Sequence, residues 1–226
     1  MKERRSTGFT LVELLIVLAL IGILAVLAVP SLLGARLSAN EAAAIGTLRS
    51  IAAAEASFRG DRIVNRNGNG EGEYGYFAEL SGRLVPRAAA AAVPHPYLPG
   101  AFRNVSGGVV TRSGYVFRMI LPAGGGAPAP EALLGGEDPA APANDLDAES
   151  VWVAYAWPAV TGSTGDRVFC IANDGDILWQ DNRATRYSGL TSPCPADAAF
   201  TAPNDVFSRR AVNAAGNDGA TWRALR

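Results

Sequence analysis

The chain starts with a short polar segment that is followed by a long run of apolar residues. Residues 1–8, MKERRSTG, carry an excess of basic side chains, and Glu13 is the only charged residue from Phe9 to Ala35. The uncharged stretch Leu14–Leu33 would form a helix about 30 Å long, which matches the hydrocarbon core of a bilayer. The basic flank predicts that the N-terminus stays in the cytoplasm and that the chain after about residue 35 lies outside.

The helical pattern continues beyond the apolar run. Pro30 removes one backbone donor and bends a helix without having to end it when lipid or other helices surround it. After it, apolar or small residues recur at steps of three and four as far as Arg59, and charged residues occupy the other face. We therefore expect one helix over about residues 9–60, membrane-embedded in residues 9–35 and amphipathic in residues 36–60.

The remaining residues, 61–226, have the pattern of a β-rich head. Alternating or aromatic and β-branched segments predict strands at Gly114–Leu121, Val151–Trp157, Arg167–Ala172 and Asp176–Gln180. Asn173-Asp174-Gly175 between the last two is a strong hairpin signal. An antiparallel sheet laid over the second half of the helix, an α+β fold, is the expected architecture.

Other parts of the head are less informative. Trp152, Trp157 and Trp179 are expected in the core or on a sheet face. Two stretches rich in Pro, Ala and Gly, Pro86–Gly100 and Pro122–Asp147, are predicted to be surface connections. The residues after Ala196 are polar and punctuated by glycine, and they indicate nothing beyond surface.

Composition excludes several kinds of chemistry. Lys and Arg total 20 against 21 Asp and Glu, a net charge of −1, so no bulk binding to nucleic acid is expected. There is one histidine, His95, and there are two cysteines, so a multi-histidine zinc site or a four-cysteine knuckle cannot form in one chain. No acid–base or nucleophile constellation stands out, and we expect no enzyme.

A glycine-rich stretch after the helix has a weak resemblance to a calcium loop. Asn65, Asn67, Asn69 and Glu71 place oxygen-bearing side chains at alternate positions around Gly70. The first position is Asn rather than Asp, and the twelfth is Tyr76 in place of a bidentate glutamate. A solvated glycine turn is the favoured interpretation, calcium is the alternative, and no other cofactor or metal is expected.

Glu13 decides between interpretations of the N-terminus. A secretory signal peptide with a poor cleavage site at Val26-Leu27-Ala28 and a plain signal anchor both account for the apolar run. Neither accounts for a carboxylate there, which opposes membrane insertion. Because the carboxylate of Glu13 is unfavourable in an apolar segment, we expect it to pair with a partner group.

The segment Gly8-Phe9-Thr10-Leu11-Val12-Glu13-Leu14-Leu15 resembles the prepilin signature of type IV pilins and of the pseudopilins of type II secretion. The resemblance implies that residues 1–8 are a leader, that prepilin peptidase cuts between Gly8 and Phe9, and that the new amino group of Phe9 is methylated. Glu13 then becomes the fifth residue of the mature chain, and Pro30 matches a frequent helix-kinking proline of pilins. In the family, this glutamate of an incoming subunit is thought to pair with the amino terminus of a subunit already in the filament.

The resemblance also implies a location and a disulfide. The chain would be a single-pass protein of the inner membrane with its head in the periplasm, and later part of an extracellular pilus or a periplasmic pseudopilus. An exported head lies in an oxidising compartment, so Cys170 and Cys194 are expected to form a disulfide like the bridged C-terminal loop of many pilins. Two free buried thiols are the alternative.

The function expected from all this is that of a structural subunit of a type IV pilus or pilus-like secretion filament. Its implied partners are further copies or other pilins, prepilin peptidase, the pilus or secretion assembly machinery, and inner-membrane lipid before assembly. Major pilin, minor pilin and pseudopilin are not distinguished by the sequence. The alternative is a membrane-anchored periplasmic binding or sensing domain that never polymerises.

Overall fold

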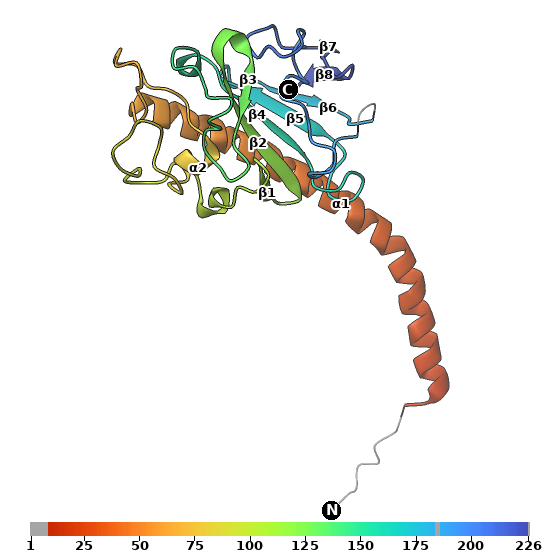
Figure 1. Cartoon of the computed structure of the whole chain (residues 1–226). Helices are drawn as coiled ribbons and strands as arrows, with labels where there is room; N and C mark the ends of the chain where they lie inside the picture. The colour runs from red at the N-terminus through yellow and green to blue at the C-terminus, as the bar shows by residue number, and fades with distance from the viewer. Residues whose placement is uncertain (1–8, 184–185, 226) are drawn as a thin grey trace, which may run out of the picture.

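A helix projects far beyond the head to which it belongs. The computed structural model of the chain describes residues 9–183 and 186–225. In it α1 (Leu11–Gly60) runs through 50 residues, and Pro30 lies inside the helix without ending it. Figure 1 shows the helix curving along its length, with its C-terminal part behind the sheet and its N-terminal part clear of the head. The expected helix over residues 9–60 is confirmed.

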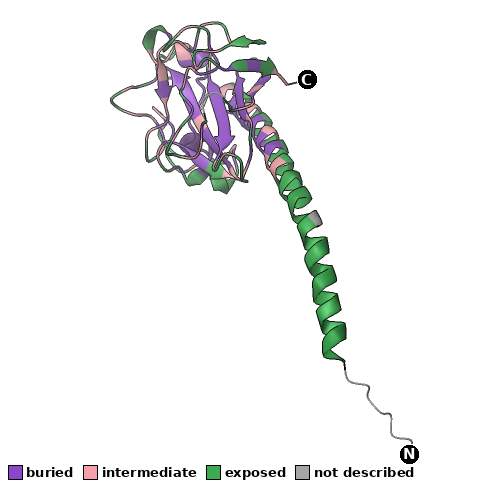
Figure 2. Ribbon diagram, turned by 90° about the vertical axis from the view of Figure 1, so that its right-hand side faces the viewer, coloured by how far each residue is buried: buried purple, intermediate pink, exposed green. Residues whose placement is uncertain are grey.

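The two halves of α1 differ in burial. The N-terminal half is exposed all round, and buried positions begin only where the helix reaches the head (Figure 2). There they recur at steps of three and four, which is one face of a helix: Ala44, Leu48, Ile51, Ala54 and Phe58. Among the described residues, α1 is the helix long and apolar enough to cross a membrane.

The head is built around an antiparallel sheet. In the part of the chain that the structure describes, the strand order is β1-β2-β4-β5-β6-β8-β7, and β3 pairs with β2 beside this path. The strands are β1 (Val110–Arg112), β2 (Tyr115–Pro122), β3 (Pro128–Pro130), β4 (Val153–Pro158), β5 (Val168–Ala172), β6 (Ile177–Gln180), β7 (Ala214–Ala215) and β8 (Thr221–Ala224). A short helix, α2 (Phe77–Leu80), and 3₁₀ turns at Gly100–Arg103, Gly124–Gly126 and Asp147–Glu149 complete the elements.

Both faces of the sheet are covered. Phe117, Ala156 and Phe169 stand opposite one another on β2, β4 and β5, and they share a buried cluster with the residues of α1. Successive strand residues point to opposite faces, so the neighbouring register positions Tyr155 and Cys170 belong to the other face. That face is buried under the C-terminal segment, whose contributions include Tyr187, Cys194, Phe200, Val206 and Ala211.

The α+β, pilin-like architecture is confirmed, and so are the four predicted strands, which become β2, β4, β5 and β6 with ends shifted by at most two residues. Trp152 and Trp157 are buried, and Trp179 is half-buried on β6.

Two expectations about the loops are wrong. The segment after Ala196 is not merely surface, because Ala198, Ala199 and Phe200 lie within the second core. The stretch Pro122–Asp147 contains β3 and the buried Glu131 as well as exposed turns. In both places the buried residues follow neither a helical nor a strand period, so the hydrophobic pattern gives no sign of their burial.

Candidate assembly site

The N-terminal end of α1 is closed by its own side chains. Thr10 is the N-cap, and its backbone N–H and hydroxyl both donate to Oε2 of Glu13, at 2.9 and 2.8 Å. The N–H of Glu13 donates to Oγ1 of Thr10 at 3.2 Å, which completes a capping box. Phe9 precedes the cap and is 80% exposed, whereas Gly8, the other side of the predicted cleavage site, lies outside the described residues.

The capping box uses only part of the Glu13 carboxylate. Oε2 accepts both hydrogen bonds from Thr10, and no hydrogen bond from the described residues reaches Oε1. A carboxylate has about four acceptor positions, so the group can bind a further donor while the cap stays intact. The sequence identified Glu13 by its isolation in an apolar run. It did not lead us to predict Thr10 as the hydrogen-bond partner of Glu13.

The rest of this half of the helix presents apolar side chains to its surroundings. From Phe9 to Leu33 its exposed large hydrophobic residues are between 43% and 80% accessible. A continuous apolar surface of this size is not left in water by a soluble monomer. Lipid or the apolar helices of other subunits would cover it.

Polar contacts fix α1 against the head just beyond the apolar run. Glu41 is buried, and its Oε2 lies 2.7 Å from Nε and 2.6 Å from Nη2 of Arg167. Its Oε1 accepts the backbone N–H of Asp166 at 3.1 Å, and the Asn40 amide donates to the carbonyl of Thr164 at 2.9 Å. These bonds set where the apolar half of α1 leaves the head.

Buried carboxylates that no sequence pattern indicated lie around the C-terminal end of α1. Glu55 is fully buried, and its Oε2 accepts the backbone N–H of Gly75 at 2.9 Å. Burial raises the pKa of Glu55 well above its ordinary value. Glu131 accepts the N–H groups of Ala78 and Gly136, at 2.9 and 3.0 Å, and burial raises its pKa to about 7. Both groups are therefore biased toward the protonated form.

Arg87 is the cation at the centre of this group. Its Nε lies 3.1 Å from Oε1 of Glu79, and its Nη1 lies 3.8 Å from Oε2 of Glu73. Burial lowers the pKa of Arg87, but neighbouring carboxylates, Glu79 foremost, outweigh this effect and leave the pKa raised. The network holds loops of the head to α1, and His95 lies apart from it on an exposed loop.

The weak calcium candidates form a turn that is closed by another residue. The amide nitrogens of Asn67 and Asn69 donate to the carboxylate of Glu149 at 2.7 and 2.9 Å. Their side-chain oxygens accept the backbone N–H groups of Asn69 and Glu71, at 3.0 and 2.8 Å. Asn65 is half-buried, and the described residues include no group of three or more His, Cys, Asp or Glu placed to hold a metal ion. The arrangement favours the glycine turn.

Cys170 and Cys194 are free, fully buried thiols, so the predicted disulfide is not formed in this structure. Cys170 stands opposite Tyr155, and the carbonyl of Cys194 accepts a hydrogen bond from Arg118 at 3.2 Å. Burial raises the pKa of Cys170 to about 12 and raises that of Cys194 as well. Because the thiolate is the form that reacts, burial makes both thiols less reactive in the folded head.

An apolar N-terminal helix with a carboxylate at its first turn, continuing into an α+β head, is the architecture of a pilin-like protein. The comparisons with known proteins agree. The prokaryotic N-terminal methylation motif matches residues 4–29. The type IV major pilin protein PilA of Myxococcus xanthus is 35% identical over 88 residues, which are 39% of each chain. The type II secretion system core protein G of Aeromonas hydrophila is 32% identical over 102 residues, 45% of this chain and 65% of the relative.

These matches confirm the resemblance to type IV pilins and pseudopilins that the N-terminal residues indicate. The chain spans about two fifths of one relative's length and just under two thirds of the other's. No solved structure gives a significant match to the chain.

Proposed function

We propose that this protein is a non-enzymatic structural subunit of a type IV pilus or a pilus-like secretion filament. It is made as a prepilin, cut by prepilin peptidase between Gly8 and Phe9, methylated at Phe9 and held in the inner membrane by α1. Assembly machinery then moves it into a polymer in which its helix packs among those of other subunits. The head lies in the periplasm before assembly and on the filament afterwards.

The observation that carries this proposal is the position and geometry of Glu13. It lies at the first turn of an exposed helix that has no other charge through Leu33, and Oε1 remains open to a donor. Cleavage before Phe9 creates an α-amino cation, and an ion in a low-dielectric environment strongly favours a complementary partner. The amino group of a neighbouring subunit supplies the donor and the charge, so the pair sets register while the apolar helices supply most of the cohesion.

The proposal includes a disulfide between Cys170 and Cys194. Cys170 of β5 and Cys194 of the C-terminal segment belong to the same buried cluster, and export places the chain in an oxidising compartment during folding. The bond would tie an irregular segment to β5 and, for a loop of this size, would stabilise the fold by about 3 kcal/mol in the chain-entropy model.

Intact and N-terminal mass analysis of protein extracted from the native membrane tests processing and oxidation together. We expect a chain that starts at Phe9 and carries one added methyl group. Its mass should be lower than that of the reduced chain by two hydrogen atoms, as one disulfide requires. A chain starting at Val29 would indicate ordinary secretion, and one retaining residues 1–8 would contradict processing. A processed chain whose mass does not change on reduction would remove the disulfide and leave the filament role standing.

A further inference from the structure

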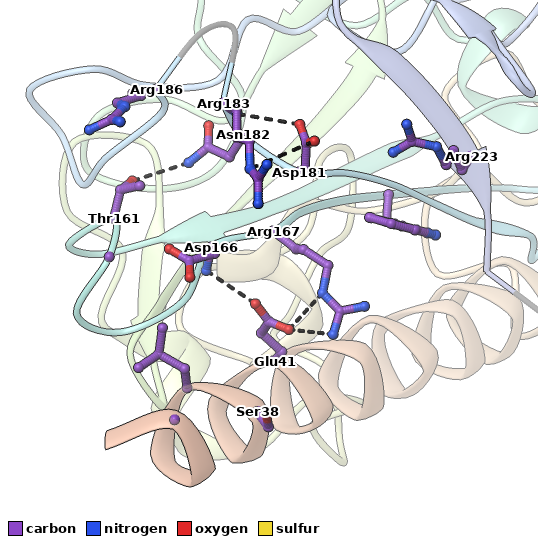
Figure 3. A pocket seen from close by; sticks show the side chains of 14 residues that line it. Ser38, Glu41, Thr161, Asp166, Arg167, Asp181, Asn182, Arg183, Arg186 and Arg223 are labelled. Atoms are coloured by element: carbon purple, nitrogen blue, oxygen red, sulfur yellow. Dashed lines mark hydrogen bonds and ion pairs between the residues drawn. The ribbon is translucent and has the colours of Figure 1, made fainter. Parts of the chain in front are cut away.

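A polar cavity of about 740 Å³ lies where α1 leaves the head. Gly34, Leu37, Ser38 and Glu41 of the helix form one wall (Figure 3). The opposite wall comes from the loop after β4, from β6 and the loop that follows it, and from β8. This wall carries four arginines, Arg167, Arg183, Arg186 and Arg223.

The cavity has cationic groups that the protein itself does not neutralise. The lining holds four arginines and three carboxylates (Glu41, Asp166 and Asp181), a net charge of +1. Glu41 forms an ion pair with Arg167, and Oδ2 of Asp181 lies 4.0 Å from Nε of Arg183. Within the described residues, no carboxylate comes within ion-pair distance of Arg186 or Arg223, and both are exposed.

Trp179 gives the cavity an aromatic side. The guanidinium carbons of Arg167 and Arg223 lie 5.3 and 5.2 Å from the centre of its ring, so the ring is flanked by two cations. Trp179 is only half-buried. A tryptophan with exposed arginines beside it is the composition typical of a membrane interface.

The helix fixes the distance of the cavity from the bilayer. Leu33 ends the uncharged run, and Leu37 and Ser38 follow it by four and five residues, which at 1.5 Å per residue is about 6–8 Å. The headgroup layer on one side of a bilayer is about 5–8 Å thick. With α1 in the membrane, the wall of the cavity formed by Leu37 and Ser38 therefore stands at headgroup level.

We propose that this cavity binds the phosphodiester headgroup of an anionic phospholipid while the subunit is held in the membrane. Guanidinium groups match phosphate oxygens in geometry and charge. Arg186 and Arg223 lie on opposite sides of the cavity (Figure 3), and each leaves its guanidinium open to a headgroup oxygen. The inference rests on the membrane anchoring in the proposed function and adds to it. The bound headgroup would hold the head against the bilayer surface and orient it until the subunit is extracted into a polymer.

The test uses the full chain in lipid nanodiscs of phosphatidylcholine, with or without phosphatidylglycerol. Native mass spectrometry counts the lipids that stay bound after the chain is released, and protease protection of α1 reports insertion separately. The test variant is Arg186→Gln/Arg223→Gln. The control is Arg49→Gln/Arg62→Gln, which removes the same charge from exposed sites. Arg49 lies about 24 Å along the helix from Leu33, so salt largely screens its charge from the bilayer surface.

We expect the wild type and the control to retain phosphatidylglycerol in preference to phosphatidylcholine. The test variant should lose that preference, with about fivefold weaker retention for each guanidinium removed. Equal retention by all variants, or no preference in an inserted wild-type chain, would overturn the headgroup site and leave the anchor intact. Displacement of the lipid by inorganic phosphate would show a general anion site instead. If the test variant changes only self-association in lipid-free detergent, the partner of the cavity is an acidic segment of another copy. Failure of α1 to insert would overturn both the membrane anchoring and the lipid site.

Discussion

At the residue scale, the buried carboxylates around the end of α1 control how stability depends on pH. Glu131 is 4% exposed, and its pKa in the folded chain is about 7 against an ordinary 4.5. The groups acting on it are the carboxylates of Glu79 and Glu55, together with three backbone N–H donors. Burial dominates, so the folded state holds a proton that the unfolded state releases.

This fixes the sign of a pH effect. Because the pKa is raised on folding, the contribution of Glu131 is fully present below about pH 4.5 and is lost as the pH rises through about 7. The loss is on the order of 3 kcal/mol. We expect Glu131→Gln to flatten the fall in the free energy of unfolding between pH 5 and 8, measured by urea unfolding of the detergent-solubilised chain, while the exposed Glu71→Gln keeps the wild-type slope. Identical slopes for wild type and Glu131→Gln would show that the carboxyl is ionised throughout.

Residues of this kind mark a limit of what the sequence reveals. Glu13 stands out because its environment is local, a lone charge among apolar neighbours in the chain. Glu55 and Glu131 are 76 residues apart, and nothing near either of them in sequence shows that folding buries both close enough to interact. Thr10 precedes Glu13 by three residues within the motif, and this spacing is the signal from which the capping box could have been predicted.

At the scale of elements, the contact between α1 and β5 decides the direction in which the apolar half of α1 leaves the head. It depends on Glu41, buried on the helix, and on Arg167, which is part-exposed at the start of the strand. Breaking an ion pair with one buried member leaves a charge without a partner, which costs more than losing a surface pair. The hydrogen bond from Asp166 to Glu41 adds a backbone contact that an amide can preserve.

A double-mutant cycle measures this connection. We expect Glu41→Gln and Arg167→Gln each to lower the free energy of unfolding by about 1–3 kcal/mol, and the double variant to lose less than the sum. Urea unfolding of the chain in detergent gives the three values. Additive losses would mean that the two side chains are not coupled and that apolar packing alone, through Phe58 and its neighbours, holds the helix on the sheet.

Helices and strands with a periodic pattern of apolar residues were predictable from the sequence, and those without such a pattern were not. The helix and the four strands β2, β4, β5 and β6 follow from steps of three and four and from alternation. The strands β1, β3, β7 and β8 have two to four residues each and carry too little pattern to be recognised. The cover over the outer face of the sheet is irregular, so its burial follows from tertiary packing alone.

At the scale of the whole molecule, the chain combines two parts with different requirements. The exposed apolar half of α1 requires lipid or other helices, and the head is closed by two cores that need neither. In the proposed function, the head is therefore stable before assembly, and the apolar surface that lipid covers in the anchored subunit would later pack against other subunits.

Substitution of Glu13 separates the two roles that its geometry supports. Glutamine at this position still completes a capping box, because its side-chain oxygen accepts from the N–H of Thr10, but it carries no charge. Alanine removes the charge and the side-chain half of the capping box, and leaves only the bond from the backbone N–H of residue 13 to Thr10. If pairing with the amino group of a neighbour drives incorporation, Glu13→Gln and Glu13→Ala should both reduce the amount of the chain in sheared filaments, by about tenfold or more, because each leaves the neighbour's cation without its partner.

In both variants we expect normal folding of the head and normal membrane insertion, measured by protease resistance and membrane fractionation, with the exposed Glu71→Gln as the control. Rescue by glutamine but not by alanine would show that Glu13 acts only as a helix cap. Indifference to both substitutions, with the chain found in the membrane and never in a polymer, would replace the filament subunit by an anchored domain that binds or senses. The uncharged variant that keeps the cap therefore decides whether the carboxylate serves its own helix or another subunit.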